Sequence, residues 1–301
     1  MKRSLSIIFL LFFFLLPFAC SKKPFHIASV NNNVCKRLTG EVVLYCIFVD
    51  TRYTQPWSAY DINSTLDSIH YAMEWLENKA SENGIPLTIT VQYHQNNNVI
   101  PISQDFPRKT LSGTLLPVIP AGIRLLDGWS NRIARNAGKA FAQDTASIIK
   151  TKNKLSDRER LIARLRDMNG TDNVALIYFI NNYYKEEMSV AIHCDSYTET
   201  EYAIVSFKQP SVIAHELLHL FGAWDLYINP FERKWKNQRR KKMAMKEFPD
   251  EIMAFAYRDI DKLNISPLTQ YLIGWRPELD DKYKSMFFGK RKNLLKYHVC
   301  K

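Results

Sequence analysis

One short segment, residues 210–222, constrains the fold more than any other part of the chain. It reads PSVIAHELLHLFG, with Pro210 suited to the first turn of a helix and Gly222 suited to the position just past a helix end. Apolar residues cover nearly every face of the predicted helix. Because a helix that is apolar all round belongs in a hydrophobic core, we expect the fold to be built around it.

Three ionisable residues, His215, Glu216 and His219, interrupt this apolar segment. Burying them costs free energy unless each has a partner. Because residues four apart stack on one face of a helix, the two imidazoles can point at a single ion. Glu216 lies next to that face, where its carboxylate can touch a metal-bound water rather than the metal. The alternative, that both histidines are ordinary hydrogen-bonded core residues, stays open at this point.

A third metal ligand is available six residues after the second histidine, at Asp225. Gly222 permits a sharp turn, with a positive φ, that can bring this aspartate back toward the histidines. Two imidazole nitrogens, one carboxylate oxygen and an open position for water form a catalytic zinc arrangement. We therefore expect Zn2+ to bind His215, His219 and Asp225. Glu216 is the expected catalytic residue, acting as a general base.

The pattern HExxHxxGxxD over residues 215–225 resembles the long zinc motif of the metzincin clan of zinc metallopeptidases. Aspartate at the last position is the minority form in that clan. The resemblance implies zinc-dependent hydrolysis of peptide bonds. Zinc would activate a water and polarise the scissile carbonyl, while Glu216 would take the proton of the water and deliver it to the leaving amine.

Metzincins also carry a methionine turn beneath the metal, and PDEIMAFAYRD, residues 249–259, resembles it with Met253 as the methionine. The helix-like segment 266–275 follows, in the order that the clan shows. One position departs from the pattern. Some members have a tyrosine two residues after the methionine, and here that residue is Phe255. Tyr257 is a possible substitute to which we assign no role.

Hydrophobic periodicity predicts five strands and several long helices. The strands are expected at residues 41–51, 86–94, 173–183, 189–195 and 202–207. The helices are expected through residues 62–76, ending at Asn83-Gly84, and over 129–168, divided in two by a capping box at Ser156 and Glu159. Residues 96–127, which contain several prolines and glycines, are predicted to be irregular.

These elements predict an α+β fold. The last two strands are too close together for a helical crossover, so at least one should be antiparallel. The metzincin resemblance implies a twisted, mixed, five-stranded sheet with long helices, a zinc-binding active-site helix and a small C-terminal subdomain. We expect a lead-in or tether over 20–40 and a catalytic domain over 41–301, with its N-terminal subdomain over 41–222 and its C-terminal subdomain over 223–301.

Residues 1–19 are predicted to be a signal peptide. Two basic residues precede an apolar run over 5–16 that is too short for a transmembrane helix. Cys20, directly after Ala19, resembles the acylated cysteine of bacterial lipoproteins, although Pro17 stands where that motif usually has leucine. We expect an exported protein anchored by lipid to a bacterial membrane, in the periplasm or at the cell surface. Plain secretion and an uncleaved anchor are the alternatives.

An exported chain can form disulfides. The cysteines that remain after Cys20 allow three pairings: Cys35, Cys46, Cys194 and Cys300. The formal net charge is +11, and it becomes +9 (39 basic minus 30 acidic residues) without the two basic residues of the signal peptide. Such a chain can favour acidic surfaces, or the charge can serve solubility alone.

The expected partners are a protein or peptide substrate and the membrane, with no nucleic acid, and the expected state is a monomer. Two other functions stay open. The chain could be a surface-tethered binding protein whose zinc is structural or lost. It could also be a gluzincin-type peptidase with Glu247 or Glu251 as third ligand, although the Glu-x-x-x-Asp pattern of that group is absent.

A basic insertion, FERKWKNQRRKKMAMKEF, occupies residues 231–248 between the zinc motif and the methionine turn. Basic residues with interleaved aromatics can bind phosphates or lipid headgroups. The plainer interpretation is a solvated loop.

Overall fold

A computed structural model describes most of the predicted catalytic domain. The described residues are 37–94, 99, 101–107, 119–139, 156–181, 189–192, 200–206, 208–228 and 234–283. The predicted signal peptide, the acylation site at Cys20 and three further cysteines, Cys35, Cys194 and Cys300, lie outside the described residues. Cys46 is described and is a free thiol buried in the longest strand of the sheet.

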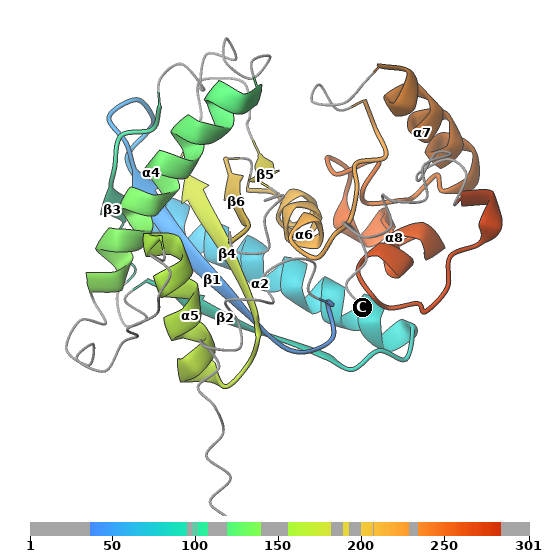
Figure 1. The fold of residues 1–301 in the computed structure, drawn as a ribbon, viewed down its shortest axis with the longest axis horizontal. Helices are drawn as coiled ribbons and strands as arrows, with labels where there is room; N and C mark the ends of the chain where they lie inside the picture. Colours follow the sequence, from blue (N-terminus) through green and yellow to red (C-terminus); the bar gives the residue numbers. More distant parts are fainter. Residues whose placement is uncertain are drawn as a thin grey trace, which may run out of the picture.

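The centre of the molecule is a mixed sheet in which all strands but one run parallel (Figure 1). The strands are β1 (Gly40–Asp50), β2 (Leu87–Tyr93), β3 (Ile102–Ser103), β4 (Asn173–Ile180), β5 (Val190–Ile192) and β6 (Tyr202–Val205). Their order is β2-β1-β4-β6-β5, and the short β3 pairs with the end of β1. β5 is antiparallel to β6 and forms one edge.

Helices cover both faces of the sheet (Figure 1). The helices α2 (Ala59–Glu82) and α6 (Pro210–His219) share one hydrophobic core with alternate residues of β1, such as Leu44 and Phe48. The helices α4 (Ile119–Lys139) and α5 (Asp157–Asn169) share the opposite core with Val43 and Tyr45. Because successive strand residues point to opposite faces, β1, which is buried on both sides, reads as one continuous apolar run.

The rest of the described chain, residues 220–283, contributes α7 (Lys234–Glu247), the short 3-10 helix η2 (Ile260–Lys262) and α8 (Pro267–Leu272). Residues just before β1 hold the end of this region. The Leu38 amide donates to the Ile273 carbonyl at 3.0 Å, and the Trp275 indole donates to the Leu38 carbonyl at 2.6 Å. Gly274, at φ 84°, makes room for Arg37, whose side chain would lie 2.7 Å from a Cβ there.

The architecture is mixed α and β, as predicted, and each of the five expected strands is present in its described part. The prediction that one of the last two strands is antiparallel is confirmed, as is the capping box of Ser156 and Glu159 at the start of α5. The division into subdomains at residue 222 stays a prediction. Among the described residues, no helix combines the length and the apolarity needed to span a membrane.

Two sequence predictions are wrong. Residues 96–127 are not all irregular, because β3 lies at 102–103 and α4 begins at Ile119. Pro120 is tolerated in the first helical turn, and the burial of Leu126 and Trp129 outweighs the helix-weakening effect of Gly128.

The solvated-loop interpretation of 231–248 is also wrong over Lys234–Glu247, where the chain forms α7. Its lysines, arginines, alanine and methionines are good helix formers, and Met243 and Ala244 are buried in the core.

Candidate metal centre

The zinc-motif helix α6 is one of the most deeply buried elements of the protein. Pro210 occupies its first turn, and every side chain from Ser211 to His219 is buried. The helix packs beside α2 and against β6. Past its end, Gly222 has φ 97°, the left-handed conformation that the sequence predicts there. The chain thereby reverses, and Asp225 returns to the helix.

Three side chains converge at this point. His215 Nε2 lies 3.0 Å from His219 Nε2 and 3.3 Å from Asp225 Oδ1, and His219 Nε2 lies 3.0 Å from the same carboxylate oxygen. These three are the group of described residues whose ligand atoms could hold one metal ion. The structure therefore brings together the three residues that the sequence predicts as ligands.

The other nitrogen of each ring determines where the protons are. His215 Nδ1 lies 3.2 Å from the Ile252 carbonyl, and His219 Nδ1 lies 2.8 Å from the Ala223 carbonyl. A carbonyl oxygen only accepts hydrogen bonds, so both Nδ1 atoms must donate. In the neutral rings both Nε2 atoms then carry lone pairs that face each other and a carboxylate oxygen. Three acceptors at this spacing repel one another unless a metal cation or an added proton lies between them.

A zinc ion fits this donor set. With zinc–nitrogen and zinc–oxygen bonds of about 2.0–2.1 Å, the edges of a tetrahedron are about 3.3 Å. The three separations of 3.0–3.3 Å between the ligand atoms agree with that value. Two imidazoles and a carboxylate are also ligands that zinc prefers, and their carbonyl partners orient the rings in the way usual for metal-binding histidines.

The two imidazole rings change the pKa of the Asp225 carboxyl group. Burial by itself raises its pKa, but without a metal ion the protonated His219 and His215 rings lower it by more, through their positive charge and the hydrogen bonds that they then donate. The net effect is a pKa well below the usual range for aspartate, so this ligand is ionised at neutral pH.

The predicted methionine turn supports the candidate ligands through its backbone. Met253 is fully buried, and its carbonyl accepts from the Leu226 amide at 2.9 Å, one residue after Asp225. The preceding carbonyl, that of Ile252, is the partner of His215. The turn thus positions one histidine and the aspartate loop at the same time.

A buried carboxylate, Glu251, holds this turn together. It accepts from the Met253 amide at 3.1 Å, the Ser266 amide at 2.5 Å and the Thr269 hydroxyl at 3.0 Å. Burial raises the pKa of Glu251, and these hydrogen bonds offset part of the rise. Glu247, the other downstream glutamate, contacts Lys282 and Tyr283. Neither glutamate is in the group that could hold the metal.

Glu216 is buried on α6 beside His215. A residue that the sequence reasoning missed, Tyr227, lies close to it. The Tyr227 ring stacks on the His215 ring with centroids 5.9 Å apart and planes 30° apart. Burial raises the pKa of Tyr227, and the charges of Asp225 and Glu216 and a hydrogen bond with Asp225 raise it further. A phenol is therefore present at the site, although position 255 has none.

Tyr227 could have been noticed as an aromatic residue two positions after a candidate ligand. The family pattern directed attention instead to the methionine turn. There, Phe255 is partly buried and contacts the Arg258 guanidinium, which lies 3.7 Å from its ring centroid. Tyr257 is 63% exposed. Comparison of the chain with protein-family models, curated proteins and solved structures found no match.

Proposed function

We propose that this protein is a zinc metalloendopeptidase of the metzincin type, with His215, His219 and Asp225 as the metal ligands. One observation carries the proposal. Three acceptor atoms, two on buried histidines and one on the partly buried Asp225, face one another within 3.3 Å, and the protons of both rings are engaged on the opposite side. The arrangement leaves a site for a cation that prefers nitrogen and oxygen ligands.

When bound, zinc supplies Lewis acidity that makes water a nucleophile near neutral pH and polarises a carbonyl group. The residues of the chain provide the rest of the reaction. Glu216 accepts a proton from the attacking water and delivers it to the nitrogen of the leaving amine. Tyr227 orients the Asp225 carboxylate through its hydroxyl and the His215 ring through its stacked face.

The sheet edge beside the metal centre suits an extended peptide. β5 is the edge strand next to β6, and α6 contacts both strands. A substrate strand that paired with β5 by main-chain hydrogen bonds would lie alongside the helix that carries Glu216. We therefore propose proteins or peptides as substrates of a monomeric enzyme, with no role for nucleic acid.

The cellular location is part of the same proposal. The N-terminal sequence favours export and acylation at Cys20, which would place the enzyme on a bacterial membrane facing the periplasm or the exterior. A protein tethered in this way would meet its substrates at the membrane surface.

The decisive experiment is Glu216→Gln in the full chain, assayed with a mixed peptide library and by metal analysis. We expect hydrolysis to fall by at least about 100-fold, because the general base is lost, while the zinc content stays at about one per chain. Equal hydrolysis by the wild type and the variant would refute the role of Glu216. Zinc in the wild type without cleavage of any peptide would favour a binding protein with a structural zinc site.

A further inference from the structure

Helix α7 has two faces of different character. Arg240, Met243 and Ala244 are buried on the inner face, and Phe248 follows them into the core. The Arg240 guanidinium lies 4.8 Å from the ring centroid of Trp224, the neighbour of Asp225. The inner face therefore holds α7 against the loop that supplies the aspartate of the candidate metal centre.

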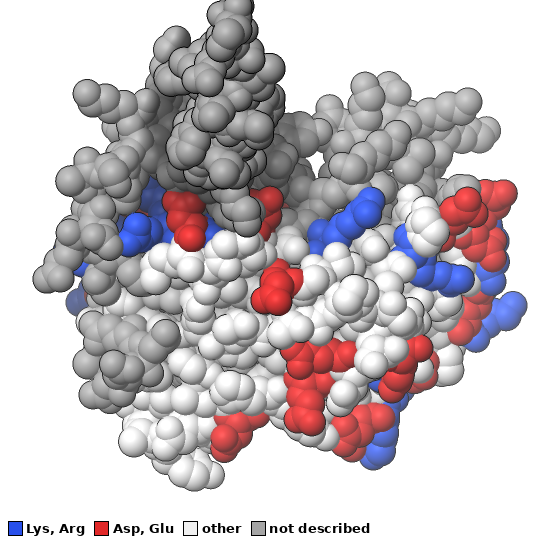
Figure 2. All heavy atoms as spheres, turned by 90° about the horizontal axis from the view of Figure 1, so that it is seen from below, with Lys and Arg blue, Asp and Glu red and all other residues white. Residues whose placement is uncertain are grey.

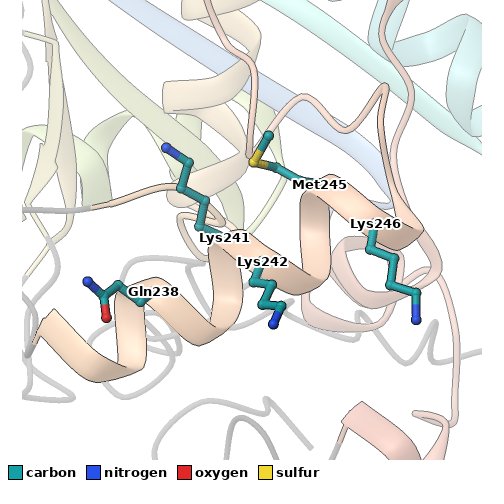
Figure 3. Close-up of a pocket in the computed structure, with 5 residues that line it drawn as sticks. All are labelled: Gln238, Lys241, Lys242, Met245 and Lys246. Atoms are coloured by element: carbon teal, nitrogen blue, oxygen red, sulfur yellow. The ribbon is translucent and has the colours of Figure 1, made fainter.

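The outer face carries positive charge around one apolar side chain. Figure 3 shows it: Lys241 and Met245 project along one side of the helix, and Lys242 and Lys246 project along the other. These residues, with Gln238, line a shallow pocket and are exposed. We name this set the lysine face: Gln238, Lys241, Lys242, Met245 and Lys246. Their spacing of three and four residues places them on one helix surface, opposite Arg240 and Ala244.

The positive charge of the protein is not spread evenly. The view from below in Figure 2 shows groups of Asp and Glu side chains with fewer Lys and Arg side chains among them. On the lysine face, by contrast, three amines lie within six residues of helix and no carboxylate lines the pocket. Such a concentration of one sign attracts an anionic surface over roughly a Debye length, about 8–10 Å at physiological salt.

We propose that the lysine face docks on a membrane surface rich in anionic phospholipids. The lysines would contact phosphate headgroups, with their aliphatic stems along the apolar boundary. Met245 decides between a lipid surface and a soluble polyanion. Met245 is 57% exposed among the amines, and contact of its apolar side chain with water is unfavourable. On a bilayer the same side chain can enter the acyl boundary and leave the water.

This proposal is independent of the proposed peptidase activity. It predicts a fixed orientation, because the docking helix is also the one that packs on the metal-site loop through Arg240 and Trp224. Membrane contact at the lysine face would hold the candidate centre at a set distance from the bilayer. Binding at this face and hydrolysis can therefore succeed or fail separately.

The test uses the full chain with Cys20→Ser in every sample, so that no acyl chain at that position contributes. Binding is measured by co-sedimentation with phosphatidylcholine vesicles, with and without about one third phosphatidylglycerol, and with soluble polyphosphate. The triple variant Lys241→Gln/Lys242→Gln/Lys246→Gln should bind the anionic vesicles roughly 100-fold more weakly, about fivefold for each lysine. The variant Met245→Ser should weaken vesicle binding several-fold and leave polyphosphate binding unchanged.

The matched control removes the same charge from the helices on the other side of the sheet. Three basic residues are exposed on α4 and α5: Arg132, Lys139 and Arg160. Changing all three to glutamine should alter vesicle binding by less than threefold, because the position of the charge on the lysine face matters more than the net charge of the protein. Equal losses in the two triple variants would overturn the proposal. So would equal effects of Met245→Ser on vesicles and polyphosphate, or wild-type binding that ignores phosphatidylglycerol.

Discussion

Helix α6 carries the two histidines of the candidate metal centre, and α7 packs through Arg240 on Trp224, the neighbour of Asp225. Both helices carry polar residues, but these residues have different meanings. In α6, two histidines and a glutamate are buried in an otherwise apolar helix, where an unpartnered polar group is costly. In α7, most charged residues reach water, where they cost almost nothing. Polarity in a buried helix is therefore a strong sign of chemistry. Polarity in a surface helix becomes informative only once its faces are known.

The largest expected effect is the loss of zinc and hydrolysis when the candidate metal centre at α6 is changed. Asp225→Ala removes the charged ligand, so zinc should be lost from the purified protein and hydrolysis with it. Addition of excess zinc, which at about 100 times its Kd stabilises a folded binder by about 2.7 kcal/mol, should raise the melting temperature of the wild type only. Glu247→Ala is the control, and zinc loss in that variant instead would favour a ligand downstream of Asp225.

A second effect concerns the carboxylate that supports the site from the methionine turn. Glu251→Ala leaves two buried amides and a hydroxyl without their acceptor, so the free energy of unfolding should fall by about 3 kcal/mol. Urea denaturation with chelator present measures this loss without the contribution of zinc. The ion pair of Glu247 with Lys282 is near the surface, so Glu247→Ala should cost less than about 1 kcal/mol. Similar costs for both would contradict the role given to Glu251.

A smaller change is expected at Tyr227. Tyr227→Phe keeps the ring on His215 and removes the hydroxyl that meets Asp225. Partners of metal ligands typically contribute 10–100-fold, so kcat/KM should fall by about tenfold while zinc remains bound. Tyr257→Phe removes the hydroxyl of a side chain that is 63% exposed and should leave kcat/KM unchanged. A fall in kcat/KM in Tyr257→Phe but not in Tyr227→Phe would show that the functional phenol is Tyr257, in the predicted methionine turn.

The smallest effect belongs to the outer face of α7. Lys242→Ala should change the free energy of unfolding by no more than about 0.5 kcal/mol, since its amine is solvated and alanine is a good helix former. Zinc content and hydrolysis should also be unchanged. A fall in the free energy of unfolding of more than about 1 kcal/mol would show that Lys242 packs against protein. The outer face of α7 would then not differ from α6 in the way described.

Local patterns in the sequence predicted most of the strands, the end of α2 at Asn83 and the start of α5 at Ser156. The alternation in β2 and the capping box of Ser156 act within a few residues, so the sequence displays them directly. The spacing of the two histidines and the glycine that turns the chain toward Asp225 are equally local. These features sufficed to propose the ligand set.

Other features depend on contacts that no local pattern encodes. Tyr227 reaches His215 only because the chain reverses after α6. α4 is stabilised by the burial of Leu126 and Trp129 against the sheet, despite the helix-weakening Gly128 between them. The helical state of α7 likewise depends on Met243 and Ala244 reaching the core from a mostly charged segment.

The hydrogen bond between Leu38 and Trp275 joins positions 237 apart in the chain, and the Leu38 amide also bonds to Ile273. A force applied through the segment ahead of residue 37 would be shared between β1 and the turn after α8. That turn follows Ser266 and Thr269, which hold Glu251 beneath the methionine turn. Tension on a molecule anchored through this segment would thus reach the residues beneath the candidate metal centre through one backbone hydrogen bond and one indole hydrogen bond. Cutting the chain just before residue 37 would remove that tension from the bonds between Leu38 and residues 273–275.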